Sequence, residues 1–383
     1  MANKIIRVGV SGISGTVGFA FCSNLRFNRN YQIQALHREP RSKDAEQLQR
    51  LCAVHQNFTG INNINLISNA NNEFNIDALE KSVNETDAFI HLAAYSRRKI
   101  PDDQAGEVLK TNVLWTAVLS RMALKAKAKR FIYASTTLIY DCFVPKNLCK
   151  TGAEEKEGLS ENVALDMAAY KDWLAKVTPL INQYSSEMTR NEKVDDPSAF
   201  IAALLAQYPI PNGTRDLYPL SKYMGEQIVS GLWDNGIEGI NLRFSPIFGP
   251  SPVDSPTRVI PFIISLINSG KELTAMPWST CMIYLNDVIT AINNAVMNPI
   301  TRENSTIHLG PHLKRYPQIE VIRHLLKAAG KQEPIKLIEA PQRCDNMLDT
   351  SRAQQELILP ETPIEEALKD TYEYFIGNRL GKK

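Results

Sequence analysis

Residues 5–18 read Ile-Ile-Arg-Val-Gly-Val-Ser-Gly-Ile-Ser-Gly-Thr-Val-Gly. The apolar run at 5–10 is typical of a buried parallel strand, and a helical pattern follows over Val17–Phe27. Glycines in the turn between them allow backbone torsions and close approaches that a Cβ would block. Loop amides and a helix N-terminus arranged in this way bind a diphosphate. The residues expected to do so are Gly12, Ser14, Gly15, Thr16, Val17 and Gly18.

The glycine spacing is G-x-x-G-x-x-G, which by itself would also suit a simple tight turn. The surrounding pattern favours the diphosphate loop. Strand-like runs recur at 31–37, 64–67, 87–92 and 131–135, with helical stretches near 76–84 and 105–127. This alternation predicts an α/β fold built on a doubly wound parallel sheet, the Rossmann architecture.

The alternation is interrupted at 145–212, which contains no strand-like run. Apolar and aromatic residues from Tyr170 to Tyr184 fall at helical spacing, and Asp196-Pro197 has the form of a helix start. A helix at 219–234 and a strand at 239–244 then restore the pattern. We therefore expect a dinucleotide-binding domain at 1–144 and 213–250, a helical insertion at 145–212, and a smaller, mainly substrate-binding lobe at 251–383.

Composition excludes several classes of function. The chain has 383 residues, of which 44% are hydrophobic, and a formal net charge of +2, so no nucleic-acid or membrane partner is expected. None of the six cysteines forms a C-x-x-C pair and no Cys/His cluster has zinc spacing, so no metal site is predicted. The N-terminus lacks an apolar signal core and no apolar stretch would span a bilayer, so the expected location is cytoplasmic.

The end of the second strand bears on the choice of cofactor. It closes with His37 and Arg38, both predicted to contact the cofactor. Sites for NAD usually carry an acid here for the ribose 2′-hydroxyl, whereas an arginine suits a 2′-phosphate. Residues 36–38 contain no acid, and Arg41 and Lys43 follow. NADP(H) is therefore favoured and NAD(H) stays open; a solvated basic loop is the alternative interpretation.

Further motifs follow in order along the chain. A strand ends in His91-Leu92-Ala93-Ala94, Asn112-Val113 lies in the next helix, and Thr136 precedes Tyr140 by four residues. Tyr218-Pro219-Leu220-Ser221-Lys222 comes later, then a strand that runs through Ser245-Pro246 to Gly249-Pro250, and finally Asp349-Thr350-Ser351-Arg352. Together with the glycine loop, this ordered set resembles the extended short-chain dehydrogenases/reductases, the NAD-dependent epimerase/dehydratase family. The likeness covers nearly the whole chain except 145–212.

The resemblance implies specific roles. The catalytic residues would be Thr136, Tyr218 and Lys222, the last two also touching the cofactor. Further cofactor contacts would come from Leu92, Ala93, Ala94, Asn112, Ser245 and Pro246. His91 resembles a structural histidine, buried and hydrogen-bonded, and Tyr133 and Tyr140 are expected to be packing residues.

The residue types suit the chemistry. Hydride transfer at a secondary alcohol needs a group that takes the hydroxyl proton, and a free tyrosine, with a pKa of about 10, ionises too little at neutral pH. A lysine four residues later lies on the same helix face, and its charge favours the phenolate. The hydroxyl of Thr136 would position the substrate oxygen. A lone Y-x-x-x-K often arises by chance; here it follows the Thr136 strand in the expected order.

Two departures from the family pattern narrow the range of expected substrates. Dehydratases of this family carry an Asp-Glu pair directly after the catalytic threonine, where this chain has Thr137 and Leu138. Removal of water from a nucleotide sugar is therefore not expected. Nucleotide-sugar members often place an arginine before the late strand at 282–287, where this chain has Thr280.

Three hypotheses follow. The leading one is a dehydrogenase or reductase acting on a ketone or secondary alcohol of a small molecule. The second is a nucleotide-sugar 4-epimerase or 4-keto reductase. The third is a cofactor-binding scaffold or redox sensor without turnover. A homodimer is common in such families and stays open, and the insertion at 145–212 is either a lid over the substrate or a packing or dimer-contact element.

Overall fold

The computed structural model describes residues 5–38, 45–61, 63–69, 76–97, 99–144, 158–190, 192, 194, 196–253 and 258–380. The chain divides into two compact units. The first comprises Met1–Val144, Ala164–Arg243 and Pro299–Thr306; the second comprises Pro145–Val163, Phe244–Asn298 and Ile307–Lys383. Among the helices of these described residues, none combines the length and apolar composition that crossing a bilayer requires.

A seven-stranded sheet has the strand order β11-β6-β5-β4-β1-β2-β3, and β1 to β5 lie wholly in the first unit. Its strands are β1 (Ile6–Ser11), β2 (Tyr31–Arg38), β3 (Ile64–Asn69), β4 (Ala88–His91), β5 (Arg130–Thr136), β6 (Glu238–Phe244) and β11 (Thr306–Leu309). The strand order reverses between β1 and β4, and both neighbours of β1 pair with it in parallel. The predicted doubly wound Rossmann sheet is confirmed.

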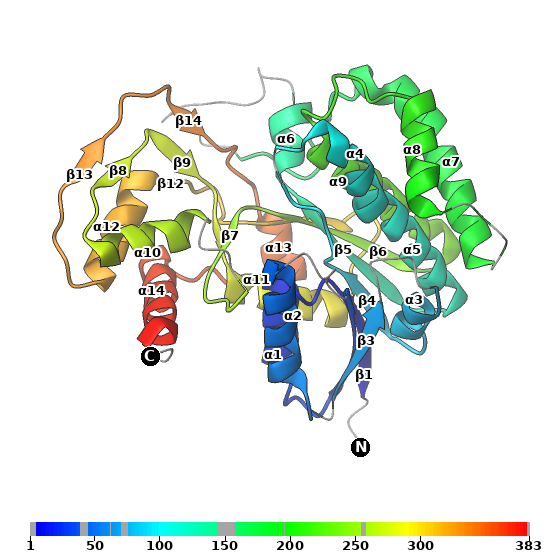
Figure 1. Ribbon diagram of the computed structural model, residues 1–383, viewed down its shortest axis with the longest axis horizontal. Helices are drawn as coiled ribbons and strands as arrows, with labels where there is room; N and C mark the ends of the chain where they lie inside the picture. The colour runs from blue at the N-terminus through cyan, green and yellow to red at the C-terminus, as the bar shows by residue number, and fades with distance from the viewer. Residues whose placement is uncertain are drawn as a thin grey trace. The chain divides into compact units, whose positions relative to one another are not determined.

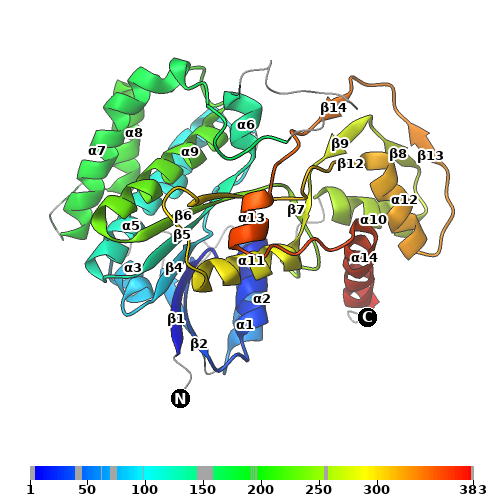
Figure 2. The same cartoon turned by 180° about the vertical axis from the view of Figure 1, so that it is seen from behind.

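Helices cover both faces of this sheet (Figures 1 and 2). On one face lie α1 (Thr16–Leu25) and α2 (Ala45–Phe58). On the other lie α3 (Ile76–Val83), α4 (Ala105–Leu109), α5 (Trp115–Lys125) and α9 (Leu217–Ser230), with α6 (Leu138–Phe143) after β5. The predicted helix at 105–127 is interrupted by a π-helical segment, Lys110–Leu114. Such segments widen a helix locally and often occur at functional sites.

The described part of the insertion contains two helices, as predicted, α7 (Lys171–Thr189) and α8 (Pro197–Gln207). Asp196 caps α8 by accepting hydrogen bonds from Ser198 N and Ala199 N, and Pro197 occupies the first helical position. Helix α7 packs on α5, and α8 packs on α4, which makes them an outer layer in Figure 1. Trp173, Val177 and Ile181 are the apolar face that α7 buries.

The second unit is smaller and mixed, with its own hydrophobic core. Its helices are α10 (Val259–Ser269), α11 (Leu285–Met297), α12 (Gln318–Ala328), α13 (Ser351–Glu356) and α14 (Ile364–Leu380). Its short strands are β7 (Ile247–Phe248), β8 (Leu273–Ala275), β9 (Trp278–Thr280), β10 (Ile283–Tyr284), β12 (Tyr316–Pro317), β13 (Ile335–Leu337) and β14 (Arg343–Cys344).

Candidate active site

The glycine loop lies between β1 and α1 at the carboxyl end of the sheet. Gly12 has φ +78°, and a Cβ there would lie 2.5 Å from the amide nitrogen of Ala93. A Cβ at Gly18 would lie 2.3 Å from the carbonyl oxygen of Gly12. Both contacts are closer than real Cβ atoms allow, so the loop conformation requires glycine at these positions.

The N-terminus of α1 presents no side chain that would compete with an anion. Its N-cap is Gly15, which offers no side chain, and its first turn contains no acid. The first amides of a helix lack internal partners and carry a partial positive charge. The loop residues Ser14 and Val17 are only partly buried, whereas Thr16 is buried. This donor set fits a dinucleotide diphosphate, and Gly12, Ser14, Gly15, Thr16, Val17 and Gly18 would hold it.

The carboxyl ends of three strands meet at this loop. Ser11 is in register with Leu36 on β2 and with His91 on β4, so the loops after all three strands open on the same edge. His37 is 4% exposed and contacts His55 edge-on, with ring centroids 4.8 Å apart. The backbone of Arg38 closes β2, but its side chain, like Arg41 and Lys43, lies outside the described part of the chain. The observation behind the NADP(H) prediction is therefore still the sequence alone.

His91 is buried and hydrogen-bonded through both ring nitrogens, as expected. Its Nδ1 pairs with the Ser11 hydroxyl at 2.7 Å and its Nε2 with the Thr116 hydroxyl at 3.0 Å. Burial, and then the nearby charge of Lys222, lower the pKa of His91 to about 3, so the ring is neutral at physiological pH. The Leu92 amide donates to the Ser11 carbonyl, which holds the start of the 92–94 loop against β1.

Asn112 joins that loop to α9. Its Oδ1 accepts from the Tyr95 amide at 2.7 Å, and its Nδ2 donates to the Tyr95 carbonyl at 3.1 Å and to the Ser221 hydroxyl at 2.9 Å. Ser221 in turn donates to the carbonyl of Tyr218 at 2.8 Å. Asn112 is fully buried on the π-helical segment, so its described bonds are to protein groups. Its predicted contact with the cofactor stays a prediction.

The predicted catalytic residues lie on two elements that pack together, Tyr218 and Lys222 on α9 and Thr136 at the end of β5. Lys222 is 2% exposed, and its ammonium donates to the Ala134 carbonyl at 2.6 Å, two residues before Thr136. It also lies 4.6 Å from the centroid of the Tyr133 ring. Tyr218 stands one helical turn earlier on the same buried face of α9. Thr136, the last residue of β5, is 6% exposed, and its Oγ1 accepts from the Leu138 amide.

The burial of Lys222 controls its proton affinity. Burial lowers its pKa to about 7, and the carboxylate of Glu226 opposes that change. An ammonium with so low a pKa exchanges its proton near physiological pH, which is unusual for lysine and common at functional sites. Tyr133 shows the opposite effect: burial, followed by the neighbouring Tyr218 and Glu226, raises the pKa of its phenol well above the ordinary value.

A buried ion pair beneath this constellation was missed from the sequence. Arg243, on β6, donates from Nε and Nη2 to the two carboxylate oxygens of Glu226, at 2.8 and 2.7 Å. Ser135 donates to the same carboxylate at 2.5 Å, and Arg243 also donates to the Tyr140 hydroxyl at 2.5 Å. The signals were an acid four residues after Lys222 and an arginine inside an apolar strand. Tyr140 and Tyr133 are buried, as expected of packing residues.

Ser245 and Pro246 belong to the second unit. The Ser245 amide donates to the Leu309 carbonyl, and the Pro246 carbonyl accepts from the Ile283 amide. The Ser245 hydroxyl is buried and finds no hydrogen-bond partner among the described residues. A buried hydroxyl of this kind is suited to a ligand contact, which is compatible with the predicted role of Ser245.

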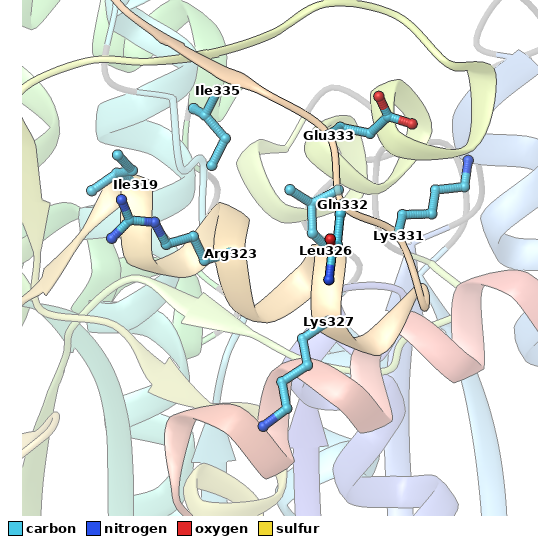
Figure 3. A pocket seen from close by; sticks show the side chains of 8 residues that line it. All are labelled: Ile319, Arg323, Leu326, Lys327, Lys331, Gln332, Glu333 and Ile335. Atoms are coloured by element: carbon cyan, nitrogen blue, oxygen red, sulfur yellow. The ribbon is translucent and has the colours of Figure 1, made fainter.

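A separate hollow of about 470 Å³ lies beside α12 in the second unit (Figure 3). Its lining residues are Ile319, Arg323, Leu326, Lys327, Lys331, Gln332, Glu333 and Ile335. This set contains none of the residues predicted to bind cofactor or to catalyse, so the hollow is no part of the candidate active site.

Comparison with known proteins supports the Rossmann fold and the family that the ordered motifs resemble. Among solved structures, a mutant of UDP-glucuronic acid 4-epimerase from Bacillus cereus, in complex with NAD and a fluorinated UDP-sugar, is 18% identical, with a TM-score of 0.69 over 97% of this chain and 100% of that one. UDP-N-acetylglucosamine 4-epimerase from Methanobrevibacter ruminantium is 17% identical, with a TM-score of 0.68 over 98% and 99%. These likenesses establish the fold.

A third solved structure, dTDP-glucose 4,6-dehydratase from Bacillus anthracis in complex with NAD, is 16% identical, with a TM-score of 0.66 over 98% of each chain. No curated protein sequence matches this chain. The family described as "NAD dependent epimerase/dehydratase family" matches residues 8–158 and 180–310, well over half of the chain. The chain therefore belongs to the NAD-dependent epimerase/dehydratase family, as its ordered motifs predict.

Proposed function

We propose that this protein is an NAD(P)-dependent oxidoreductase that acts at a ketone or secondary alcohol of a small molecule. One observation carries the proposal. Lys222 is buried one helical turn after Tyr218 and is hydrogen-bonded to β5 two residues before Thr136. The glycine loop and the N-terminus of α1, which has no side-chain cap, lie at the same edge of the same sheet.

A bound nicotinamide would supply or accept the hydride. The protein's own residues handle the proton. Tyr218 would exchange it with the substrate oxygen through its phenolic hydroxyl, and the positive charge of Lys222 would stabilise the phenolate that results. The Thr136 hydroxyl would hydrogen-bond the same substrate oxygen and fix its position. Burial of all three side chains keeps competing water away and strengthens the effect of the lysine charge.

NADP(H) is the proposed cofactor, and NAD(H) remains the alternative. The support is the absence of an acid at 36–38 together with the basic residues that follow. Two of the solved structures named above, the Bacillus cereus epimerase mutant and the Bacillus anthracis dehydratase, are complexes with NAD, which is the argument for the alternative. Titration with both cofactors decides between them: equal or tighter binding of NAD(H) would refute the preference.

A nucleotide-sugar 4-epimerase or 4-keto reductase is the second candidate. The likeness to 4-epimerases of UDP-sugars favours it. Against it, Thr280 stands where nucleotide-sugar members of the family often have an arginine, and its hydroxyl donates to the carboxylate of Asp345 at 2.6 Å. On the paired strand β14, however, Arg343 lies over the ring of Trp278 at 5.9 Å and offers a guanidinium. A cofactor that stays bound through purification would favour the epimerase, and free exchange would favour the reductase.

A scaffold or redox sensor without turnover is the third candidate. The buried Tyr218, Lys222 and Thr136 argue against it, because a protein that only binds a cofactor has no need for a buried ammonium beside a phenol.

We further propose a packing role for the insertion helices, since α7 and α8 bury their apolar faces on α5 and α4. A cytoplasmic location and a homodimer remain proposals from the sequence.

Substitution of Tyr218 by Phe tests the function. The change removes only the phenolic oxygen, so fold and cofactor binding should survive. Turnover of a ketone or alcohol substrate should fall by at least ~10²-fold, the lower end for loss of general acid–base catalysis. Tyr223→Phe, the same change elsewhere on α9, is the matched control and should leave turnover near the wild-type value. Near-normal turnover in Tyr218→Phe would show that the proton moves by another route.

A further inference from the structure

The buried pair of Glu226 and Arg243 has no part in the proposed chemistry, although Glu226 lies on α9, the helix that carries Tyr218 and Lys222. Glu226 is 2% exposed and Arg243 6% exposed. Two parallel N–H···O bonds join them, the strongest geometry for this pair of groups. Burial of two charges costs more than a hydrophobic pair of the same size would, so stability alone is a weak reason for the pair.

Each partner is also fixed from a second side. Ser135 on β5 donates to Glu226 Oε1, and the Tyr140 hydroxyl on α6 accepts from Arg243 Nη1. The carboxylate therefore receives donors from β5 and β6 while its own backbone belongs to α9. It cannot turn away without leaving buried donors unsatisfied.

The pair is tied to the candidate active site through α9. Glu226 follows Lys222 by four residues, so the two side chains lie on one face of the helix. Lys222 donates to the carbonyl of Ala134, and Glu226 accepts from the hydroxyl of the next residue, Ser135. Two successive residues of β5 are thus attached to two successive turns of α9, and the next residue of β5 is Thr136.

Titratable groups face Lys222 from three elements, β4, β5 and its own helix α9. Tyr133 on β5 lies under the ammonium, Tyr218 precedes it on α9, and the neutral ring of His91 lies on β4. The charge of Glu226 also contributes to the raised pKa values of Tyr223 and Tyr133. Among the described groups, Glu226 is the acid whose charge acts on the lysine.

We propose that Glu226 is a positioning residue of the active site: its carboxylate keeps the buried Lys222 ammonium charged beside Tyr218 and ties α9 to the strand end that carries Thr136. Arg243 and Ser135 hold that carboxylate in place. The inference rests on the proposed function only for its consequence in turnover; the effect on the lysine is a property of the protein without substrate.

The test is a titration of Lys222 itself in the full-length protein. Lysine labelled with ¹³C at Cε reports its charge by NMR, and the Lys222→Met variant identifies the signal. In Glu226→Gln the pH midpoint of Lys222 should fall by at least about one unit, a tenfold loss of proton affinity. Tyr140→Phe, which removes another buried partner of Arg243 but leaves the acid, is the matched control and should leave the midpoint where it is.

Glu226→Gln leaves a buried guanidinium without its acid and can prevent folding. The double variant Glu226→Leu with Arg243→Met removes both charges and keeps the volume, and it should lower the midpoint in the same direction. An unchanged midpoint in either folded variant would overturn the inference. If the midpoint moves as expected while Tyr218→Phe keeps near-normal turnover, the proposed function fails and the lysine–acid coupling stands. If the midpoint is unmoved while Tyr218→Phe is inactive, the reverse holds.

Discussion

Replacement of Lys222 by Met should make the protein's stability less dependent on pH. The wild-type lysine is 2% exposed, and burial lowers its pKa to about 7, against an ordinary value near 10.5 in the unfolded chain. Between these two values the unfolded state binds more protons than the folded state. Wild-type stability must therefore increase as pH rises from about 7 to about 10.5.

The magnitude follows from the shift. The midpoints differ by about 3 to 4 units, and each unit corresponds to about 1.4 kcal/mol. As pH rises from about 6 to about 10, titration of Lys222 should increase the wild-type free energy of unfolding by about 4 kcal/mol. The Met variant should lack this increase. The variant also loses the bond to the Ala134 carbonyl, at a cost of about 1–3 kcal/mol, but that cost does not depend on pH.

Urea unfolding of wild type and variant at several pH values measures the difference directly. Titrating groups remote from Lys222 are common to both proteins and cancel in the comparison. Lys176→Met, the same change at an exposed position of α7, is the control and should follow the wild-type curve. Stability curves for wild type and Lys222→Met that run parallel over this range would refute the argument that the lysine is buried at a low pKa.

Four further changes have expected outcomes. Gly12→Ala should abolish cofactor binding in a titration, because the added Cβ would lie 2.5 Å from the Ala93 amide nitrogen; binding at wild-type strength would contradict the loop geometry. Arg38→Ala should weaken NADP(H) selectively, by about 1.5–3 kcal/mol, measured against NAD(H). Trp173→Ala should cost about 3–5 kcal/mol in chemical unfolding, since the indole is buried against the α5 layer. Asp196→Ala should cost only about 1 kcal/mol, the usual loss for a helix cap.

Local patterns predicted the fold well. The strands at 31–37 and 131–135 were expected within a residue or two of β2 and β5, because a buried parallel strand is a continuous apolar run. Asp196-Pro197 predicted the start of α8 for a similarly local reason. The helix expected at 105–127 was right in place but not in form, since the π-helical segment at Lys110–Leu114 has no periodic signature.

The candidate site was predictable where its residues are close in sequence. Tyr218 and Lys222 share a helix face because of their spacing, and the glycine loop follows from the adjoining strand and helix. By contrast, the sequence could not show that Asn112 is held by Tyr95 and Ser221, residues 17 and 109 positions away. Pairings over such separations depend on which strands and helices become neighbours, and periodicity does not report that.

The doubly wound sheet and the candidate diphosphate loop could be predicted from the sequence, because short-range spacing encodes both. The candidate Tyr–Lys–Thr set followed from the order of motifs that resembles the family. The environment of Lys222, by contrast, is set by contacts that form only when the chain folds. Its proton affinity depends on desolvation by β5 and on the charge of Glu226. The position of that charge depends in turn on Ser135, 91 residues away, and on Arg243. Electrostatic energies depend on distance in space and on the removal of water, and both exist only after the chain has folded.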